Sequence, residues 1–316
     1  MLPESCYTRS GASLAGKPLT GLVDTRRLLR EFDDGATVVL QGLHRYWPPL
    51  RDLVAELELE LGHTCQANAY LTPPGSQGFA VHSDAHDVFV FQTHGHKQWE
   101  LHTDGGVEEV LLEPGVSMYL PTGTPHAARA QDAVSLHVTL GIHQLTWRQV
   151  VEDAVLDLLA EVPDTHVPAG WLDRPDRLAA GLRGQLDRVA EGARRLDVDG
   201  VVRQRAERFL TTRGTRLPGG LRDVLAVRDL TDATRLVRRS GHPCDLVDTD
   251  DGTRTGLRVL LGDRHLDVPA RLRPALELVR ERSALTPGDL ASHLDLESRL
   301  VLCRRLVREG LLGVPG

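Results

Sequence analysis

Residues 78–92 read GFAVHSDAHDVFVFQ, and this stretch decides the fold that we expect for the chain. Its second half contains Val88–Phe91, a short apolar run typical of a β-strand. In an extended strand the side chains at positions i and i+2 share a face, so His82 and Asp84 point the same way, about 7 Å apart along the backbone. That arrangement suits two ligands of one metal ion.

Similar strand-like runs, separated by Gly and Pro, occur elsewhere in the first half of the chain at Thr37–Leu40, Gln98–Leu101 and Val134–Val138. Eleven of the thirteen Phe, Trp and Tyr residues lie within residues 1–147, so the composition changes at about that point. Several short strands with turns between them are typical of an all-β barrel or sandwich. We therefore expect a β-barrel domain over residues 1–146.

The pattern becomes helical after the barrel. Trp147–Glu161 is one helical run, and a second run has an apolar residue every three or four positions from Leu178 to Leu196. Such an apolar stripe must be covered, and helices outside the barrel core can pack on a second copy of the chain. A third run, Val201–Leu210, ends before a Gly/Pro-rich linker. We expect residues 147–218 to be a helical region through which the chain forms a homodimer.

The last part of the chain combines a strand-like run, Leu257–Leu261, with a helix, a turn and a second helix around Leu276–Leu312. This order predicts a winged helix over residues 219–316. Residues 267–316 contain eight Arg against seven Asp and Glu, so this region lacks the positive excess that DNA binding requires. We expect the winged helix to be structural or to dock a protein rather than to bind DNA.

The overall composition limits the class of partner and the compartment. A formal net charge of −7 argues against nucleic acid as the main partner. No stretch approaches the ~18 uninterrupted apolar residues of a membrane helix, and the N-terminus lacks a basic-then-apolar export signal. The four cysteines are scattered without C-x-x-C spacing, which is typical of thiols in a reducing compartment. These features predict a cytoplasmic location.

A third metal ligand must come from a distant strand, because an H-x-D pair alone is weak support for a metal site. Two His and one carboxylate on one face of a metal leave positions open for a bidentate co-substrate and O₂. His126 is the best candidate, because the Pro/Gly-rich turn at residues 121–125 follows a strand and would place its imidazole near the barrel mouth. His86 with Asp87 is a rival pair, but adjacent residues on a strand point to opposite faces.

Lysine is rare in this chain, since the 37 Lys and Arg residues include only two lysines, Lys17 and Lys97. A turn at residues 93–96 would reverse the chain and place Lys97 on the antiparallel strand next to the one that carries His82. A cation deep in a barrel can hold the distal carboxylate of 2-oxoglutarate while the keto-acid end chelates the metal. Tyr70 could add a hydroxyl hydrogen bond to the same carboxylate.

Several motifs together resemble the JmjC-type cupin family that includes the ribosomal oxygenases. They are NAYLTPPGSQGF at residues 68–79, the His82-x-Asp84 pair, QTHGHKQW at 92–99, EPG at 113–115 and PTGTPH at 121–126. The resemblance spans most of the chain. It implies a mixed α and β chain with a double-stranded β-helix, a helical dimerisation region and a C-terminal winged helix.

The resemblance also implies a chemistry and a set of site residues. Its metal would be Fe(II), its co-substrates 2-oxoglutarate and O₂, and its reaction the hydroxylation of a side chain in a protein, most often a ribosomal protein, or a peptide. The family's metal ligands map onto His82, Asp84 and His126, and its 2-oxoglutarate contacts map onto Tyr70 and Lys97, with Asn68 nearby. Ser135 and His137 lie in a matching strand, without an assigned role.

Two features depart from the family pattern. Ser83 stands between the ligands where many relatives carry Tyr, which would alter the substrate wall. The family usually has a longer segment before the region that matches residues 21–24, so we expect either a start that is truncated relative to the family or the absence of part of the substrate groove. Neither departure touches the metal ligands.

Other functions stay open at this point. A metal-dependent cupin dioxygenase or isomerase that does not use 2-oxoglutarate would keep the metal ligands but would not need Lys97 and Tyr70. A non-enzymatic regulator that senses a small molecule and binds DNA would need positive charge that the chain lacks. Within the oxygenases, a hydroxylase that tailors a peptide natural product would carry the same motifs.

Overall fold

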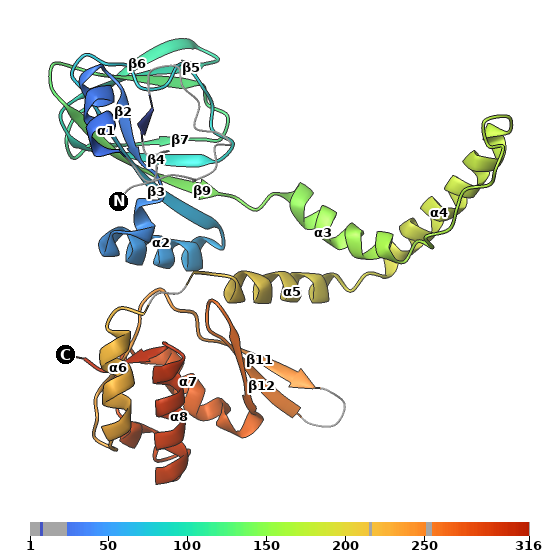
Figure 1. Cartoon of the computed structure of the whole chain (residues 1–316). Helices are drawn as coiled ribbons and strands as arrows, with labels where there is room; N and C mark the ends of the chain where they lie inside the picture. The colour runs from blue at the N-terminus through green and yellow to red at the C-terminus, as the bar shows by residue number, and fades with distance from the viewer. Residues whose placement is uncertain (1–6, 9–23, 215–216, 251–254, 316) are drawn as a thin grey trace. The chain divides into compact units, whose positions relative to one another are not determined.

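Two antiparallel sheets form the first part of the structure, a computed structural model that describes residues 7–8, 24–214, 217–250 and 255–315 (Figure 1). The larger sheet has the strand order β1-β2-β3-β9-β4-β7 and the smaller has β6-β5-β8. The strands of the larger sheet are β1 (Tyr7–Thr8), β2 (Thr37–Leu40), β3 (Thr64–Thr72), β4 (Asp87–His94), β7 (Ser117–Leu120) and β9 (Ser135–His143). Those of the smaller sheet are β5 (Lys97–Thr103), β6 (Gly106–Leu112) and β8 (His126–Ala130).

The chain crosses from one sheet to the other between β4 and β5. β4 pairs with β9 and β7, whereas β5 pairs with β6 and β8. The prediction that Lys97 lies on the strand next to β4 is therefore wrong. Gly95 allows the crossing, because its φ is +61° and a Cβ there would lie 2.2 Å from the carbonyl oxygen of Val134. A turn motif shows that the chain changes direction, but not which sheet it then joins.

An apolar layer joins the two sheets. Val88 and Val90 of β4 and Leu120 of β7 pack with Trp99 and Leu112 of the smaller sheet. These inward-facing residues alternate along each strand with outward-facing ones, as the pleat of a β-strand requires. The layer holds the sheets together beside the pocket described below.

One helix covers the outer face of the larger sheet. Val54 of α2 (Pro48–Leu61) packs on a buried cluster from β3 and β9 that contains Cys65, Ala67, Leu140 and Ile142. Two prolines begin α2, and Gly62 ends it in the left-handed conformation. The short turn η2 (Leu43–Arg45) precedes α2.

Helix α1 (Thr25–Asp33) lies before β2 and begins at a cap. The carboxylate of Asp24 accepts hydrogen bonds from the backbone amides of Arg26 and Arg27. Such a cap satisfies amides that the first turn of a helix leaves without partners. The segment at residues 21–23, which carries most of the predicted family match near the start, lies outside the described residues.

Contacts divide the chain into two units, residues 1–144 and 145–316. The second begins with α3 (Trp147–Ala160), α4 (Pro175–Arg195) and α5 (Val198–Thr211), which agree with the three predicted helical runs. Thr146 and Gln149 form a capping box at the start of α3. Large apolar side chains stay exposed on these helices, with Trp147 at 85%, Leu182 at 55% and Leu186 at 57%.

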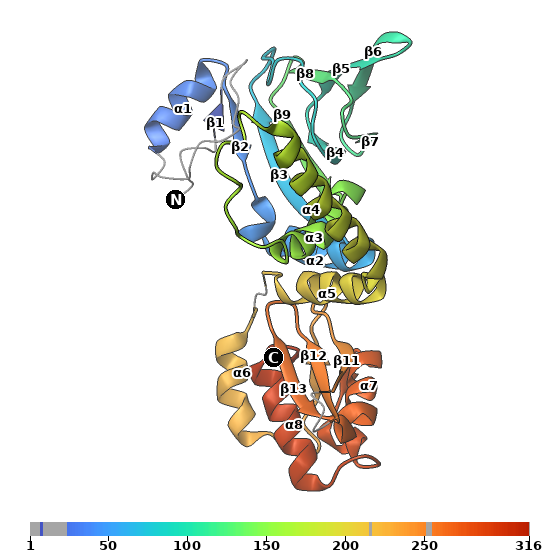
Figure 2. The same cartoon turned by 90° about the vertical axis from the view of Figure 1, so that its right-hand side faces the viewer.

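The rest of the second unit contains two three-stranded sheets, β14-β10-β15 and β11-β12-β13, with helices beside them (Figure 2). A large buried cluster, which includes Leu236, Leu257, Leu276 and Leu306, connects strands and helices. The elements are α6 (Gly220–Ala226), η3 (Val227–Asp229), β10 (Leu236–Arg238), β11 (Asp245–Asp250), β12 (Thr255–Leu260), β13 (His265–Pro269), η4 (Ala270–Leu272), α7 (Arg273–Glu281), β14 (Ala284–Leu285), η5 (Pro287–Leu290), α8 (Leu296–Arg308) and β15 (Leu312–Gly313).

The predicted division into residues 1–146, 147–218 and 219–316 stays a prediction. Its first boundary lies close to the one between the two units, and the structure groups everything after residue 144 together. No helix in the described ranges is both long enough and apolar enough to cross a membrane.

Candidate metal centre and pocket

The structure brings together His82, Asp84 and His126. Their candidate ligand atoms, one from each side chain, all lie within 4.8 Å of one another. His82 and His126 pair through two backbone hydrogen bonds, His82 N to His126 O at 3.1 Å and His126 N to His82 O at 2.8 Å. This isolated bridge precedes β4, which begins only at Asp87, so the H-x-D pair lies in extended chain just before the regular strand.

Both histidine rings are oriented by backbone carbonyls. His82 Nδ1 lies 2.9 Å from the oxygen of Ala80, and His126 Nδ1 lies 2.9 Å from the oxygen of Thr124. A carbonyl only accepts, so each Nδ1 carries the proton and each Nε2 keeps its lone pair free. Burial also lowers the pKa of His126, which favours the neutral form that a metal ligand needs.

The Asp84 carboxylate is the third donor of the cluster, and it forms no hydrogen bond with His126. Its Oδ2 lies 3.8 Å from His126 Nε2, which is too long for a hydrogen bond. The backbone oxygen of Asp84 accepts a hydrogen bond from Gly123 N at 2.8 Å, so the turn that leads to His126 is tied directly to Asp84. Two imidazoles and a carboxylate on one face form the donor set expected of a facial metal site.

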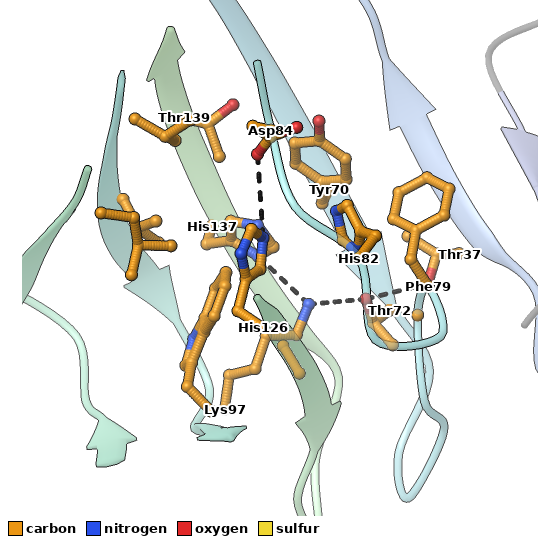
Figure 3. A pocket seen from close by; sticks show the side chains of 16 residues that line it. Thr37, Tyr70, Thr72, Phe79, His82, Asp84, Lys97, His126, His137 and Thr139 are labelled. Atoms are coloured by element: carbon orange, nitrogen blue, oxygen red, sulfur yellow. Dashed lines mark hydrogen bonds and ion pairs between the residues drawn. The ribbon is translucent and has the colours of Figure 1, made fainter. Parts of the chain in front are cut away.

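A pocket extends from this cluster between the two sheets (Figure 3). Trp99 lines it between His126 and His137, with ring centroids 5.8 and 5.3 Å away, and is only 4% exposed. Its indole Nε1 is buried and has no hydrogen-bond partner among the described residues. A buried donor without a partner is uncommon in a folded protein.

Lys97 reaches the same pocket and is 2% exposed. Its amine donates to Thr72 Oγ1 at 2.8 Å and lies 3.1 Å from His137 Nδ1 (Figure 3). Burial lowers the pKa of Lys97 to about 7. Burial, together with the charges of Lys97 and His126, holds the pKa of His137 well below its usual value, so His137 is neutral and accepts from Lys97.

Tyr70 lines another part of the pocket, whereas Asn68 is not among the residues that line it. The Tyr70 ring stacks on His137, with centroids 4.7 Å apart, and its hydroxyl is within hydrogen-bonding range of Asn68 and Thr139. Burial raises the pKa of Tyr70, so the hydroxyl stays protonated. Asn68 Oδ1 accepts from Gly42 N at 2.8 Å. The hydroxyl that contacts Lys97 is therefore that of Thr72 rather than that of Tyr70.

Thr72 and His137 were not assigned roles from the sequence. Thr72 follows Tyr70 by two positions on β3, and Thr72 Oγ1 also lies 3.1 Å from Thr37 Oγ1 on β2. Tyr70 is paired with His137 in the register of β3 and β9. Thr72 could have been predicted from the sequence, because it lies two positions after Tyr70 and so shares its face of β3. His137 could not, because its place beside Tyr70 depends on the pairing of two distant strands.

A family model described as the JmjC domain matches residues 47–106 and 103–150. These ranges contain the clustered His82, Asp84 and His126, together with Tyr70 and Lys97. The two facing sheets and the site at their mouth agree with that match. The match over residues 47–150 confirms the predicted resemblance to the JmjC-type cupin family.

Similar curated proteins are ribosomal oxygenases and their relatives. The chain is 35% identical over 150 residues to ribosomal oxygenase 1 of Rattus norvegicus, which covers 40% of this chain and 25% of that protein. It is 30% identical over 158 residues to the bifunctional lysine-specific demethylase and histidyl-hydroxylase NO66 of Aedes aegypti, with coverages of 43% and 25%. The chain thus matches about a quarter of the length of these relatives.

Solved structures with a similar fold include the ribosomal oxygenase YcfD of Escherichia coli. One has a TM-score of 0.53 at 20% identity and covers 89% of this chain and 78% of that chain. Another, of YcfD with cobalt and succinic acid, has a TM-score of 0.51 at 19% identity and covers 89% and 79%. This likeness shows a shared fold and confirms the predicted mixed α and β architecture with a JmjC-type barrel.

The burial of Lys97 predicts a gain in stability when it is replaced. The unfolded chain binds a proton at Lys97 up to about pH 10, while the folded chain releases it near pH 7, so this residue disfavours folding at neutral pH and less so as the pH rises. We expect Lys97→Met to raise the free energy of unfolding at pH 7 by roughly 1–3 kcal/mol in urea titrations. The gain should shrink toward pH 10. A loss of stability at pH 7 would contradict this reading of the site.

Proposed function

We propose that this protein is an Fe(II)- and 2-oxoglutarate-dependent oxygenase that hydroxylates a side chain of a protein. The observation that carries the proposal is the buried Lys97 amine, held by neutral partners in the same pocket as the cluster of two histidines and an aspartate. A buried cation without a charged partner is costly unless an anion joins it. A dicarboxylate that also binds the metal would supply this anion.

His82, Asp84 and His126 would hold the iron. Their donor types suit Fe(II), the two Nε2 atoms are free, and the 3.8 Å gap between His126 Nε2 and Asp84 Oδ2 leaves space between the ligands. Because the ligands occupy one face, the other coordination positions stay open. When bound, iron with 2-oxoglutarate and O₂ supplies an oxidant strong enough to hydroxylate a C–H bond, and the co-substrate leaves as succinate and CO₂.

Lys97 and Thr72 would bind the distal carboxylate of 2-oxoglutarate. The Lys97 amine supplies the charge and the Thr72 hydroxyl lies beside it at 2.8 Å. Tyr70 lines the pocket, and its protonated hydroxyl is a further donor for the co-substrate, while Asn68 stays a proposed contact near Tyr70.

The apolar layer of Val88, Val90 and Leu120 borders the pocket and would keep water from the reacting atoms. The substrate class rests on the relatives, whose names include ribosomal oxygenase and histidyl-hydroxylase. We therefore propose a ribosomal protein as the substrate. A peptide substrate is the alternative that the same iron chemistry allows.

The helices α3–α5 support a homodimer. Trp147, Leu182 and Leu186 are more than half exposed in one chain, and a second copy would bury them. The dimer is expected to give twice the chain mass in light scattering after size exclusion. A monomer at micromolar concentration would exclude it.

The elements from α6 to β15 support a winged helix at the C-terminal end. The meander β11-β12-β13 would supply the wing, and α7 with α8 would supply the helix pair. We propose that it docks protein rather than DNA, because acidic residues pair with its arginines: Arg299 with Asp232, and Arg273 with Asp248. A cytoplasmic location agrees with this set of partners.

Turnover tests the central proposal. Anaerobically purified protein with Fe(II), 2-oxoglutarate and ribosomal proteins should, once O₂ is admitted, form succinate and add one oxygen atom to a substrate, as measured by mass spectrometry. Asp84→Ala should abolish both signals. Lys97→Ala should lose 2-oxoglutarate binding while metal binding is retained. Failure of the wild-type protein to bind 2-oxoglutarate or to form succinate with any protein or peptide would refute the proposal.

The lowered pKa of Lys97 predicts the pH dependence of 2-oxoglutarate binding. Below pH 7 the amine is charged in the free protein, and above it the proton must be taken up on binding, so the affinity should fall by about tenfold per pH unit from pH 7 to 9. Isothermal titration of the Mn(II) form measures this. Lys97→Arg stays charged throughout and should remove the slope. A wild-type slope equal to that of Lys97→Arg would contradict the assignment.

A further inference from the structure

The turn at residues 121–125 leads directly into His126, and a carboxylate outside the pocket holds it. Asp87, at the first position of β4, accepts three hydrogen bonds. Its Oδ1 accepts from Thr122 N at 2.8 Å and from Thr122 Oγ1 at 2.7 Å, and its Oδ2 accepts from Tyr119 OH at 2.5 Å. Asp87 thus binds both the last residues of β7 and the turn that follows.

These bonds extend a series of contacts between two chain segments. His82 and His126 pair through their backbones, and Gly123 N donates to Asp84 O at 2.8 Å. Asp87, three residues after Asp84 and at the start of β4, adds a third contact, to Thr122. The segment that carries two ligands is therefore fixed to the third ligand by one of these contacts and to the turn before it by the other two. Asp87 supplies the only side chain among these contacts that binds the turn from β4.

The charge of Asp87 suits this role. The hydrogen bond from Tyr119, followed by those from Thr122, holds the pKa of Asp87 well below its usual range, so the carboxylate stays ionised. In return the carboxylate raises the pKa of Tyr119, which therefore stays a donor. On the far side, Gln144 Oε1 accepts from Asp87 N at 3.3 Å, which joins the start of β4 to the end of β9.

We propose that Asp87 is a positioning residue for the metal centre, because its carboxylate holds the 121–125 turn in the place that directs His126 toward His82 and Asp84. The inference rests on the proposed function, since it concerns the same three ligands. Without the Asp87 carboxylate the turn keeps only its backbone contacts to the ligand segment. The His126 ring then samples more positions, and the metal binds more weakly.

Co(II) binding tests this without turnover. Visible absorption during titration gives both the affinity and the ligand field of the bound ion. Asp87→Ala should weaken Co(II) binding by about 10–100-fold, the usual effect of removing a group that orients ligands, and should change the absorption bands. Asp87→Asn keeps an acceptor for Thr122 but loses the charge, so it should fall between wild type and Asp87→Ala. Tyr119→Phe removes one of the three donors and should have a smaller effect.

Asp24→Ala is the matched control. Asp24 is another aspartate of the same unit that accepts from two backbone amides, and it caps α1 rather than the turn. It should cost stability while leaving the Co(II) affinity and spectrum unchanged. If Asp87→Ala fails to fold by circular dichroism, Asp87→Asn and Tyr119→Phe decide the question.

The outcomes separate the two proposals. If wild-type protein binds Co(II) no better than Asp84→Ala does, the metal centre itself is refuted. If wild type binds Co(II) and Asp84→Ala does not, but the folded Asp87 variants match wild type within twofold and keep its spectrum, only the positioning role of Asp87 is overturned.

Discussion

Two backbone hydrogen bonds between His82 and His126 fix the geometry on which the site depends. They join the segment just before β4 to the first residue of β8, and so bring together ligands that are distant in the sequence. Since each histidine also donates from Nδ1 to a nearby carbonyl, both rings are oriented by the main chain. The main chain therefore sets where the two histidine ligands lie, and the side chains around them, among them Phe79 and Trp99, pack on rings that are already oriented.

The interior of the barrel has an apolar side and a polar side. On one side Val88, Val90 and Leu120 make an apolar wall, while Lys97, Thr72 and His137 make a polar group that contains a buried amine. The crossing at Gly95 creates this difference, because it moves the chain from β4 into the smaller sheet two residues before Lys97. A glycine without catalytic chemistry thereby decides where the buried charge lies.

Local periodicity was enough to pair His82 with Asp84, and the motif around residues 121–126 was enough to select His126. The helical runs after residue 147 also followed from apolar spacing. The strand order could not be predicted from the sequence. A turn such as that at 93–96 has the same composition whether the chain returns to its sheet or crosses to another. His137 could therefore not be predicted as a partner of Lys97, because it comes from a distant strand. Asp87 was considered only as a rival metal ligand, because its partners Tyr119 and Thr122 lie more than 30 residues away in the sequence.

The buried amine of Lys97 makes the stability of the folded protein depend on the concentration of its dicarboxylate ligand. A dicarboxylate that pairs with it binds only the folded form, so by mass action each tenfold excess over its dissociation constant adds about 1.4 kcal/mol to stability. Under the proposed function, a cell poor in 2-oxoglutarate holds a less stable protein as well as a slower enzyme. The supply of co-substrate would then set how much of this protein survives proteolysis.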